Sequence, residues 1–95
     1  MISINVMVVL DLVAIVKKRE LTFSLNEGTT IKQFIETMIS IYGPKLEKAI
    51  YADKDKGELN LNIYLNGQHI HFINGLDSLL QDGDTLLFMP HAGGG

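Results

Sequence analysis

The segment between residues 31 and 42 constrains the fold more than any other part of the sequence. Its apolar residues recur at intervals of three and four, which places them along one face of a helix; they are Ile31, Phe34, Ile35, Met38, Ile39 and Tyr42. Thr30 and Gln33 have the spacing of a capping box, and Gly43 followed by Pro44 stops the helix. The pattern predicts one amphipathic helix whose apolar face must pack against a second layer.

Segments that alternate apolar and polar residues flank this helix and predict the second layer as a sheet. The alternation at the start of the chain runs into the apolar stretch Met7–Leu10, which is typical of a central strand covered on both faces. Asn66-Gly67 is the pattern of a tight hairpin turn. The predicted strands cover residues 2–10, 21–25, 59–65, a return strand through Ile70 and Phe72, and 85–89.

The remaining segments are predicted to connect these elements. Residues 11–19 have room for one helical turn, residues 45–51 keep some helical spacing, and the charged stretch 52–58 is expected to be an exposed loop. A further helical turn is expected around Leu76, Leu79 and Leu80. The chain is thus predicted to be one two-layer α+β domain over residues 1–90, followed by a flexible tail at 91–95.

Composition limits the function classes. The 95 residues suffice for one core, and the net charge of −3, with no basic block beyond Lys17–Arg19, favours neither nucleic acid nor a membrane surface as a partner. The apolar start, residues 1–16, is interrupted by polar side chains and is too short to span a bilayer, so a cytoplasmic protein is expected. With no cysteine, any sulfur chemistry must use sulfur from elsewhere.

Two sets of side chains resemble metal ligands without completing a site. His69 and His71 are two residues apart on a predicted strand and so on one face, but no carboxylate adjoins them in sequence. Three carboxylates follow the main helix, but lysines are interleaved with them and the rest of a calcium loop is missing; they are Asp53, Asp55 and Glu58. We therefore expect no metal and no stably bound cofactor.

The segment from Leu80 to Gly95 carries the most specific signal. It reads as a leucine, a polar residue, Asp82-Gly83-Asp84, an apolar strand, a proline and a glycine-rich end. This order resembles the closing stretch of the small subunit of molybdopterin synthase and related ubiquitin-like sulfur carrier proteins. Met89 stands where an aromatic is frequent and His91 where a second proline is usual. The resemblance implies a ubiquitin-like β-grasp fold, with a mixed sheet of about five strands crossed by one main helix.

The resemblance also implies the chemistry. In this family a ubiquitin-activating-type enzyme uses ATP to adenylate the terminal glycine, here Gly95 after Gly94, and a sulfur donor protein converts the acyl-adenylate into a thiocarboxylate. The sulfur then attacks a pterin precursor inside the large subunit of molybdopterin synthase, which supplies the basic residues. The chain is accordingly expected to be a substrate of the activating enzyme and the small subunit of a synthase that makes molybdopterin or tungstopterin. It is not expected to be a catalyst alone.

Strand alternation predicts where partners dock. Leu86 and Phe88 should enter the core, which leaves Leu87 and Met89 on the other face as an apolar anchor for the large subunit or the activating enzyme. The expected partner-binding residues are Leu87, Met89, Pro90, His91, Ala92 and Gly93.

Three other functions remain open from the sequence. A ubiquitin-like modifier joined to lysines of target proteins would have the same tail. A sulfur carrier for thiamine synthesis is disfavoured, because those relatives are usually shorter and lack the 53–58 loop. A plain interaction domain with an inert tail is the fourth possibility.

Overall fold

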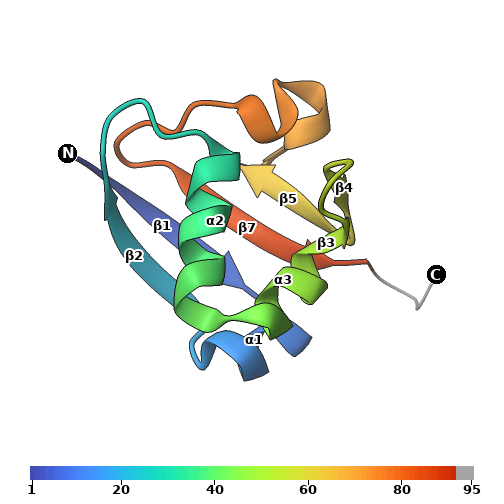
Figure 1. Cartoon of the computed structure of the whole chain (residues 1–95). Coiled ribbons are helices and arrows are strands. Elements are labelled where there is room, and N and C mark those ends of the chain that lie inside the picture. The colour runs from blue at the N-terminus through green and yellow to red at the C-terminus, as the bar shows by residue number, and fades with distance from the viewer. Residues whose placement is uncertain (92–95) are drawn as a thin grey trace.

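The computed structural model describes residues 1–91, which form a sheet with helices packed against it (Figure 1). The elements in chain order are β1 (Ile2–Val8), α1 (Asp11–Val16), β2 (Glu20–Leu25), α2 (Ile31–Tyr42), α3 (Pro44–Ile50), β3 (Tyr51–Asp53), β4 (Glu58–Leu59), β5 (Leu61–Leu65), β6 (Gln68–His69), the 3₁₀ turns η1 (Ile70–Phe72) and η2 (Gly75–Asp77), and β7 (Thr85–Pro90).

The main sheet is mixed and has five strands in the order β2-β1-β7-β5-β6. β1 pairs antiparallel with β2 and parallel with β7, and β7 pairs antiparallel with β5. The parallel pair at the centre joins the two ends of the described chain. The predicted mixed sheet crossed by one main helix is therefore confirmed.

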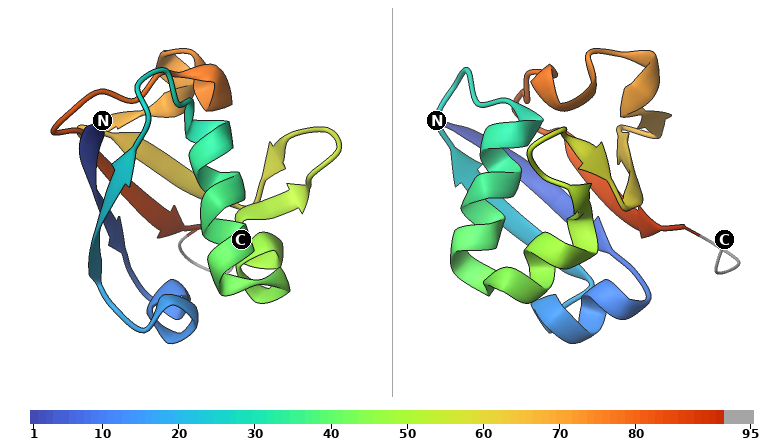
Figure 2. Two further views of the ribbon diagram at one scale, coloured as in Figure 1. Left: turned by 60° about the vertical axis from the view of Figure 1, so that its left-hand side comes forward. Right: turned by 45° about the vertical axis from the view of Figure 1, so that its right-hand side comes forward.

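Helix α2 begins and ends where the sequence predicts. The hydroxyl of Thr30 accepts a hydrogen bond from the Gln33 backbone N–H at 3.2 Å, and the Gln33 side chain accepts one from the Thr30 backbone N–H at 3.0 Å. Gly43, at φ 85°, ends the helix, and Pro44 begins the short helix α3 at once, since a proline needs no hydrogen-bond acceptor in a first turn. Both α2 and α3 lie on the same side of the sheet (Figure 2).

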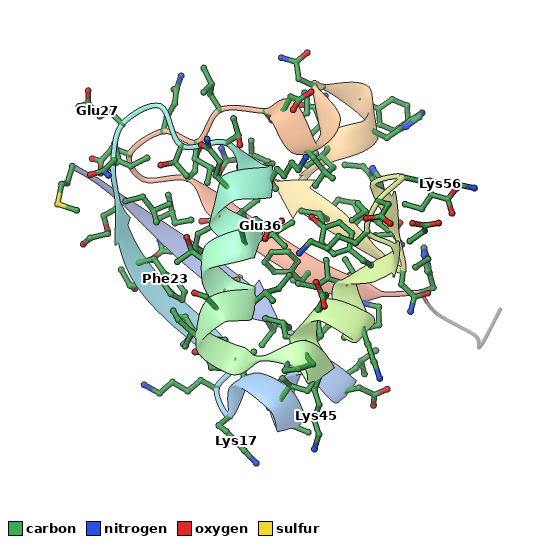
Figure 3. The ribbon with its side chains drawn as sticks, viewed as in Figure 1. Lys17, Phe23, Glu27, Glu36, Lys45 and Lys56 are labelled. Atoms are coloured by element: carbon green, nitrogen blue, oxygen red, sulfur yellow. The ribbon has the colours of Figure 1, made fainter. Side chains whose placement is uncertain are left out.

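The core lies between α2 and the sheet. Phe34, Ile35 and Met38 are almost fully buried, as predicted, and Ile39 is partly buried against the same cluster. Their buried counterparts on the sheet are Ile4, Val6, Ile63, Leu86 and Phe88. Figure 3 shows the side chains, with Phe23 on β2 and with the charged ends of Lys17 and Lys45 at the periphery.

Four local predictions need correction. β1 is central but covered on one face only, because its burial alternates and Met7 is 38% exposed. The stretch 52–58 is largely a β3–β4 hairpin with a tight turn, not a plain loop. The return strand ends at His69: residues 70–72 form η1, with Ile70 buried and Phe72 75% exposed. The expected helical turn is η2, and Leu79 instead bridges to Thr30.

The Asn66-Gly67 turn is confirmed, with positive φ at both residues. The Asn66 side chain also accepts from the Thr85 backbone N–H and donates to Asp84, which ties this hairpin to the start of β7. None of the helices within residues 1–91 is long and apolar enough to cross a membrane.

Candidate functional site

Strand β7 leads directly to the chain end that the sequence singles out. Its last residue, Pro90, pairs with Leu61 of β5, and His91 is the final described residue. The predicted reactive residue Gly95 and its neighbours Ala92, Gly93 and Gly94 lie outside the described residues.

The side chains of β7 divide between the two faces of the sheet as predicted. Leu86 and Phe88 are 0% and 1% exposed in the core, whereas Leu87 and Met89 are only half-buried on the face that α2 does not cover. The direction of these side chains is confirmed. Their role in binding a partner stays a prediction.

The open face carries a continuous row across four strands. Met7 of β1 lies beside Leu87 of β7, Leu87 beside Tyr64 of β5, and Tyr64 beside His69 of β6. Residues paired directly across strands point to the same face, so the thioether, the leucine and the tyrosine ring form one apolar stripe. Met89 extends this stripe by one step toward the end of β7. We call Met7, Tyr64, Leu87 and Met89 the open-face stripe.

A polar group adjoins the end of this stripe. Asn62 of β5 lies directly opposite Met89, and its side-chain nitrogen is 3.4 Å from Nδ1 of His91. The Asn62 oxygen is 3.0 Å from Nε2 of His69, and Nδ1 of His69 accepts a hydrogen bond from the His71 backbone N–H at 3.0 Å. Asn62 therefore links two histidines from distant parts of the chain.

Asn62 was missed from the sequence. The alternation of β5 placed it on the polar side, but its contact with His91 depends on the pairing of β5 with β7. No local pattern reports that pairing.

His69 and His71 lie on different elements, at the end of β6 and in η1. Their rings are 6.3 Å apart between centroids, and both ring nitrogens of His69 have hydrogen-bond partners. Because residues 70–72 form η1 and not the expected strand, the His71 side chain is exposed to solvent. Residues 1–91 contain no group of three or more potential metal-ligating side chains close enough to share an ion.

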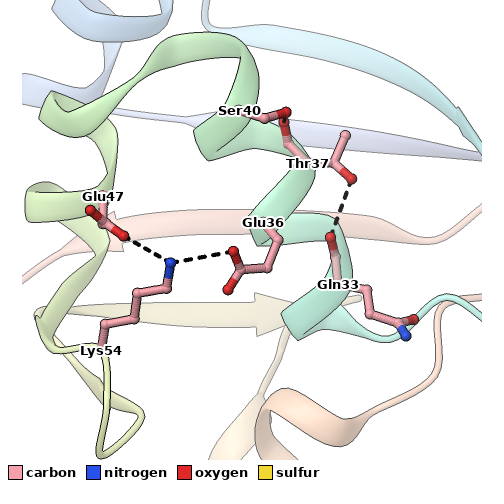
Figure 4. A network of polar contacts seen from close by, with 6 residues as sticks. All are labelled: Gln33, Glu36, Thr37, Ser40, Glu47 and Lys54. Atoms are coloured by element: carbon pink, nitrogen blue, oxygen red, sulfur yellow. Dashed lines mark hydrogen bonds and ion pairs between the residues drawn. The ribbon is translucent and has the colours of Figure 1, made fainter.

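The acidic segment after α3 has a structural role. Lys54 on the β3–β4 hairpin contacts Glu47 of α3 at 2.9 Å and Glu36 of α2 at 3.4 Å (Figure 4). Hydrogen bonds to Glu47 and then to Glu36 raise the pKa of Lys54 above its usual range. The carboxylate of Asp53 accepts from the Lys56 backbone N–H and stabilises the turn.

Tyr51 lies beneath these charges. Its hydroxyl is buried and has no hydrogen-bond partner among the described residues. Burial is the larger cause that raises the pKa of this phenol, and the nearby Glu36 carboxylate raises it further.

Comparison with known proteins places this architecture in context. The model of the ThiS family matches residues 8–95. A candidate sulfur carrier protein from Archaeoglobus fulgidus is 31% identical over an alignment of 88 positions, and the match covers 82% of this chain and 97% of that protein.

Solved structures agree on the fold. The small archaeal modifier protein 1 of Methanosarcina acetivorans superposes with a TM-score of 0.80 at 28% identity, covering 100% of this chain and 98% of that one. A candidate molybdopterin converting factor subunit 1 from Pyrococcus furiosus gives a TM-score of 0.77 at 22% identity, covering 95% and 98%. The predicted ubiquitin-like β-grasp fold is confirmed.

Proposed function

The chain belongs to the ThiS family of ubiquitin-like sulfur carriers, and on this premise we propose that it carries sulfur for the synthesis of molybdopterin or tungstopterin. In this proposal Gly95 is adenylated and then thiocarboxylated, and Gly94 keeps the chain narrow beside it. The finished thiocarboxylate donates its sulfur within a synthase formed with a larger subunit.

The observation that carries the proposal is the position of the open-face stripe. Leu87 and Met89 lie on the strand that ends at Pro90, five residues before Gly95. A partner that covers this stripe is held beside Pro90, close in sequence to Gly95. Glycine residues have no side chains, so the segment beyond that point can enter a narrow active site.

The division of labour follows from the chemistry of a carboxylate. A carboxylate becomes an acyl donor only when one of its oxygens is converted into a good leaving group, which the activating enzyme achieves with ATP. The chain has no cysteine, so the sulfur comes from a separate donor protein. The pathway assignment is supported by the resemblance in Leu80–Gly95 and by the likeness to the Pyrococcus furiosus structure.

The test is to coexpress the protein with a matching activating enzyme and sulfur donor and to measure its intact mass. We expect a gain equal to the mass of sulfur minus that of oxygen, localised by fragmentation to Gly95. Adding a large synthase subunit and the pterin precursor should then return the carboxylate form. A chain that is never thiocarboxylated, in a mixture that converts another family member, would overturn the proposal.

A protein modifier is the second candidate, and the 28% identity to the archaeal modifier protein favours it. In that case the activated Gly95 is joined to lysines of other proteins. Conjugates that survive denaturation, with a glycine on target lysines in peptide spectra, would support this function. Transfer of sulfur to a thiazole-forming partner, and not to the pterin precursor, would instead assign the chain to thiamine synthesis.

A further inference from the structure

Three hydrogen bonds connect the His71 backbone N–H through His69 and Asn62 to His91, and they have only one consistent arrangement of protons. The backbone N–H of His71 can only donate, so Nδ1 of His69 must accept and carries no proton. A neutral His69 then carries its proton on Nε2 and donates to the Asn62 side-chain oxygen, 3.0 Å away. This contact fixes which end of the Asn62 amide faces each ring.

The fixed amide determines what its other end can bind. With its oxygen toward His69, Asn62 presents its NH₂ group to Nδ1 of His91 at 3.4 Å. The NH₂ group only donates, so His91 must accept with an unprotonated Nδ1. The contact selects the neutral His91 ring with its proton on Nε2.

The framework behind Asn62 is well held. The His69 ring meets the Tyr64 ring edge to face, with centroids 5.2 Å apart and planes at 83°. Tyr64 and His69 are also direct partners in the β5–β6 pairing. Asn62 faces Met89 across β5 and β7, and His91 is the diagonal neighbour two residues further along, a position that long side chains reach.

We propose that Asn62, oriented by His69, is a positioning residue that holds the His91 ring and so fixes the backbone at the residue from which the last four residues continue. The inference rests on the proposed function, because only an activated chain end needs such a fixed origin. Four residues span at most about 13–14 Å. An origin that moves by a few ångströms therefore spreads the positions that Gly95 can reach. This freedom must be lost when the chain end enters a partner's active site, so a fixed origin favours binding.

The contact itself is tested in the free protein, without any partner. Long-range ¹H–¹⁵N spectra of the histidine rings should show an unprotonated Nδ1 at His91, and ring contacts to the Asn62 amide protons. In Asn62→Asp the carboxylate can only accept, so the His91 proton should move to Nδ1, while the His71 ring stays unchanged. His91 signals that are identical in the parent, Asn62→Asp and Asn62→Leu would overturn the contact.

A matched pair of variants tests whether His69 orients Asn62, and whether His71 acts through its backbone N–H and not through its ring. His69→Phe keeps an aromatic ring against Tyr64 but removes the donor to Asn62, so the contact of Asn62 with His91 should weaken. His71→Ala removes a neighbouring ring but keeps the backbone N–H, so the contact should persist. Equal effects of the two variants would remove His69 from the role.

The positioning role is read from mobility and kinetics. In Asn62→Leu the order parameter of the His91 backbone amide should fall. The KM for adenylation should rise about threefold to tenfold, which is the factor expected for the loss of one hydrogen bond, while kcat stays within about twofold of the parent value. Asn5→Ala, on the same face, is the control and should change neither. His91→Leu should have the same effect as Asn62→Leu, and the double variant should be no worse than either alone. Additive effects, or an unchanged order parameter, would overturn the positioning role even if Gly95 is thiocarboxylated normally.

Discussion

The ring of Phe34 on α2 meets the ring of Phe23 on β2 edge to face, with centroids 5.0 Å apart and planes at 76°. Phe34 is fully buried, whereas Phe23 is partly buried at the rim of the core. The pair therefore joins the main helix to the outermost long strand of the sheet, in the geometry that aromatic quadrupoles favour.

Replacing Phe34 by Ala should lower the free energy of unfolding by about 3–5 kcal/mol, because a large cavity opens beneath α2. Denaturant titration measures the loss. Ile41→Ala on the same helix is the control and should cost far less, since Ile41 is 57% exposed. A loss under about 1 kcal/mol for Phe34→Ala would mean that the helix does not pack as described.

Replacing Tyr51 by Phe should raise the free energy of unfolding by about 1 kcal/mol, because it removes a buried hydroxyl that has no partner among residues 1–91. A loss of similar size in chemical denaturation would show that the hydroxyl is hydrogen-bonded in solution.

The same substitution should change the alkaline limb of stability. Burial and Glu36 raise the pKa of Tyr51 in the folded state. The stability linked to this pKa difference is fully present below the unfolded pKa of about 10, and it is lost as the pH rises through the folded pKa, because the unfolded chain loses the phenol proton first. The raised pKa of Lys54 acts in the same direction. Unfolding measured between about pH 8 and pH 11 should therefore show a shallower alkaline decline in Tyr51→Phe than in the parent. Parallel curves would contradict this account.

Met89→Arg should fold normally and bind the activating enzyme or large subunit poorly, because a guanidinium would have to be desolvated against an apolar partner surface. Calorimetric titration measures the affinity. Leu79→Arg is the matched control, an exposed leucine away from the open-face stripe, and should bind as the parent does. Equal affinities for both variants would remove Met89 from the interface.

The length of the chain after Pro90 should matter as much as its sequence. Deleting Gly95 leaves Gly94 as a terminal glycine but shortens the reach by about 3.3–3.6 Å, so thiocarboxylation should fall sharply while docking survives. One residue added after Gly95 should also block the reaction. Intact mass measures both. An extended chain that acquires the thiocarboxylate as readily as the parent, without trimming, would show that Gly95 is not the working end.

The parts of the fold that the sequence predicts are those with local causes. The helix over 31–42 was found with its caps because periodicity and the Thr30–Gln33 pattern are encoded within a few residues. The inward direction of Leu86 and Phe88 followed from simple alternation.

The parts of the fold that the sequence does not predict depend on contacts between residues that are far apart in the chain. An apolar run shows that burial is possible but not which face is covered, so Met7 was wrongly expected to be buried. The continuation at Ile70 and Phe72 has the spacing of a strand, yet residues 70–72 form η1, which leaves Phe72 exposed. Asn62 and His91 are 29 positions apart, and only the register of β5 and β7 brings them together.

The parallel pairing of β1 with β7 also sets how the chain must fold. The carboxylate of Asp82, just before β7, accepts a hydrogen bond from the backbone N–H of Ser3, 79 positions earlier. Contacts of such separation form only after the cost of closing a long loop has been met, so they slow folding relative to a helical protein of the same size. The β1–β2 hairpin and α2 can form early, but the sheet has no centre until β7 inserts between β1 and β5. We therefore expect substitutions in β7, such as Leu86→Ala, to act mainly on the unfolding rate if β7 docks after the transition state, and mainly on the folding rate if its docking is the nucleating event.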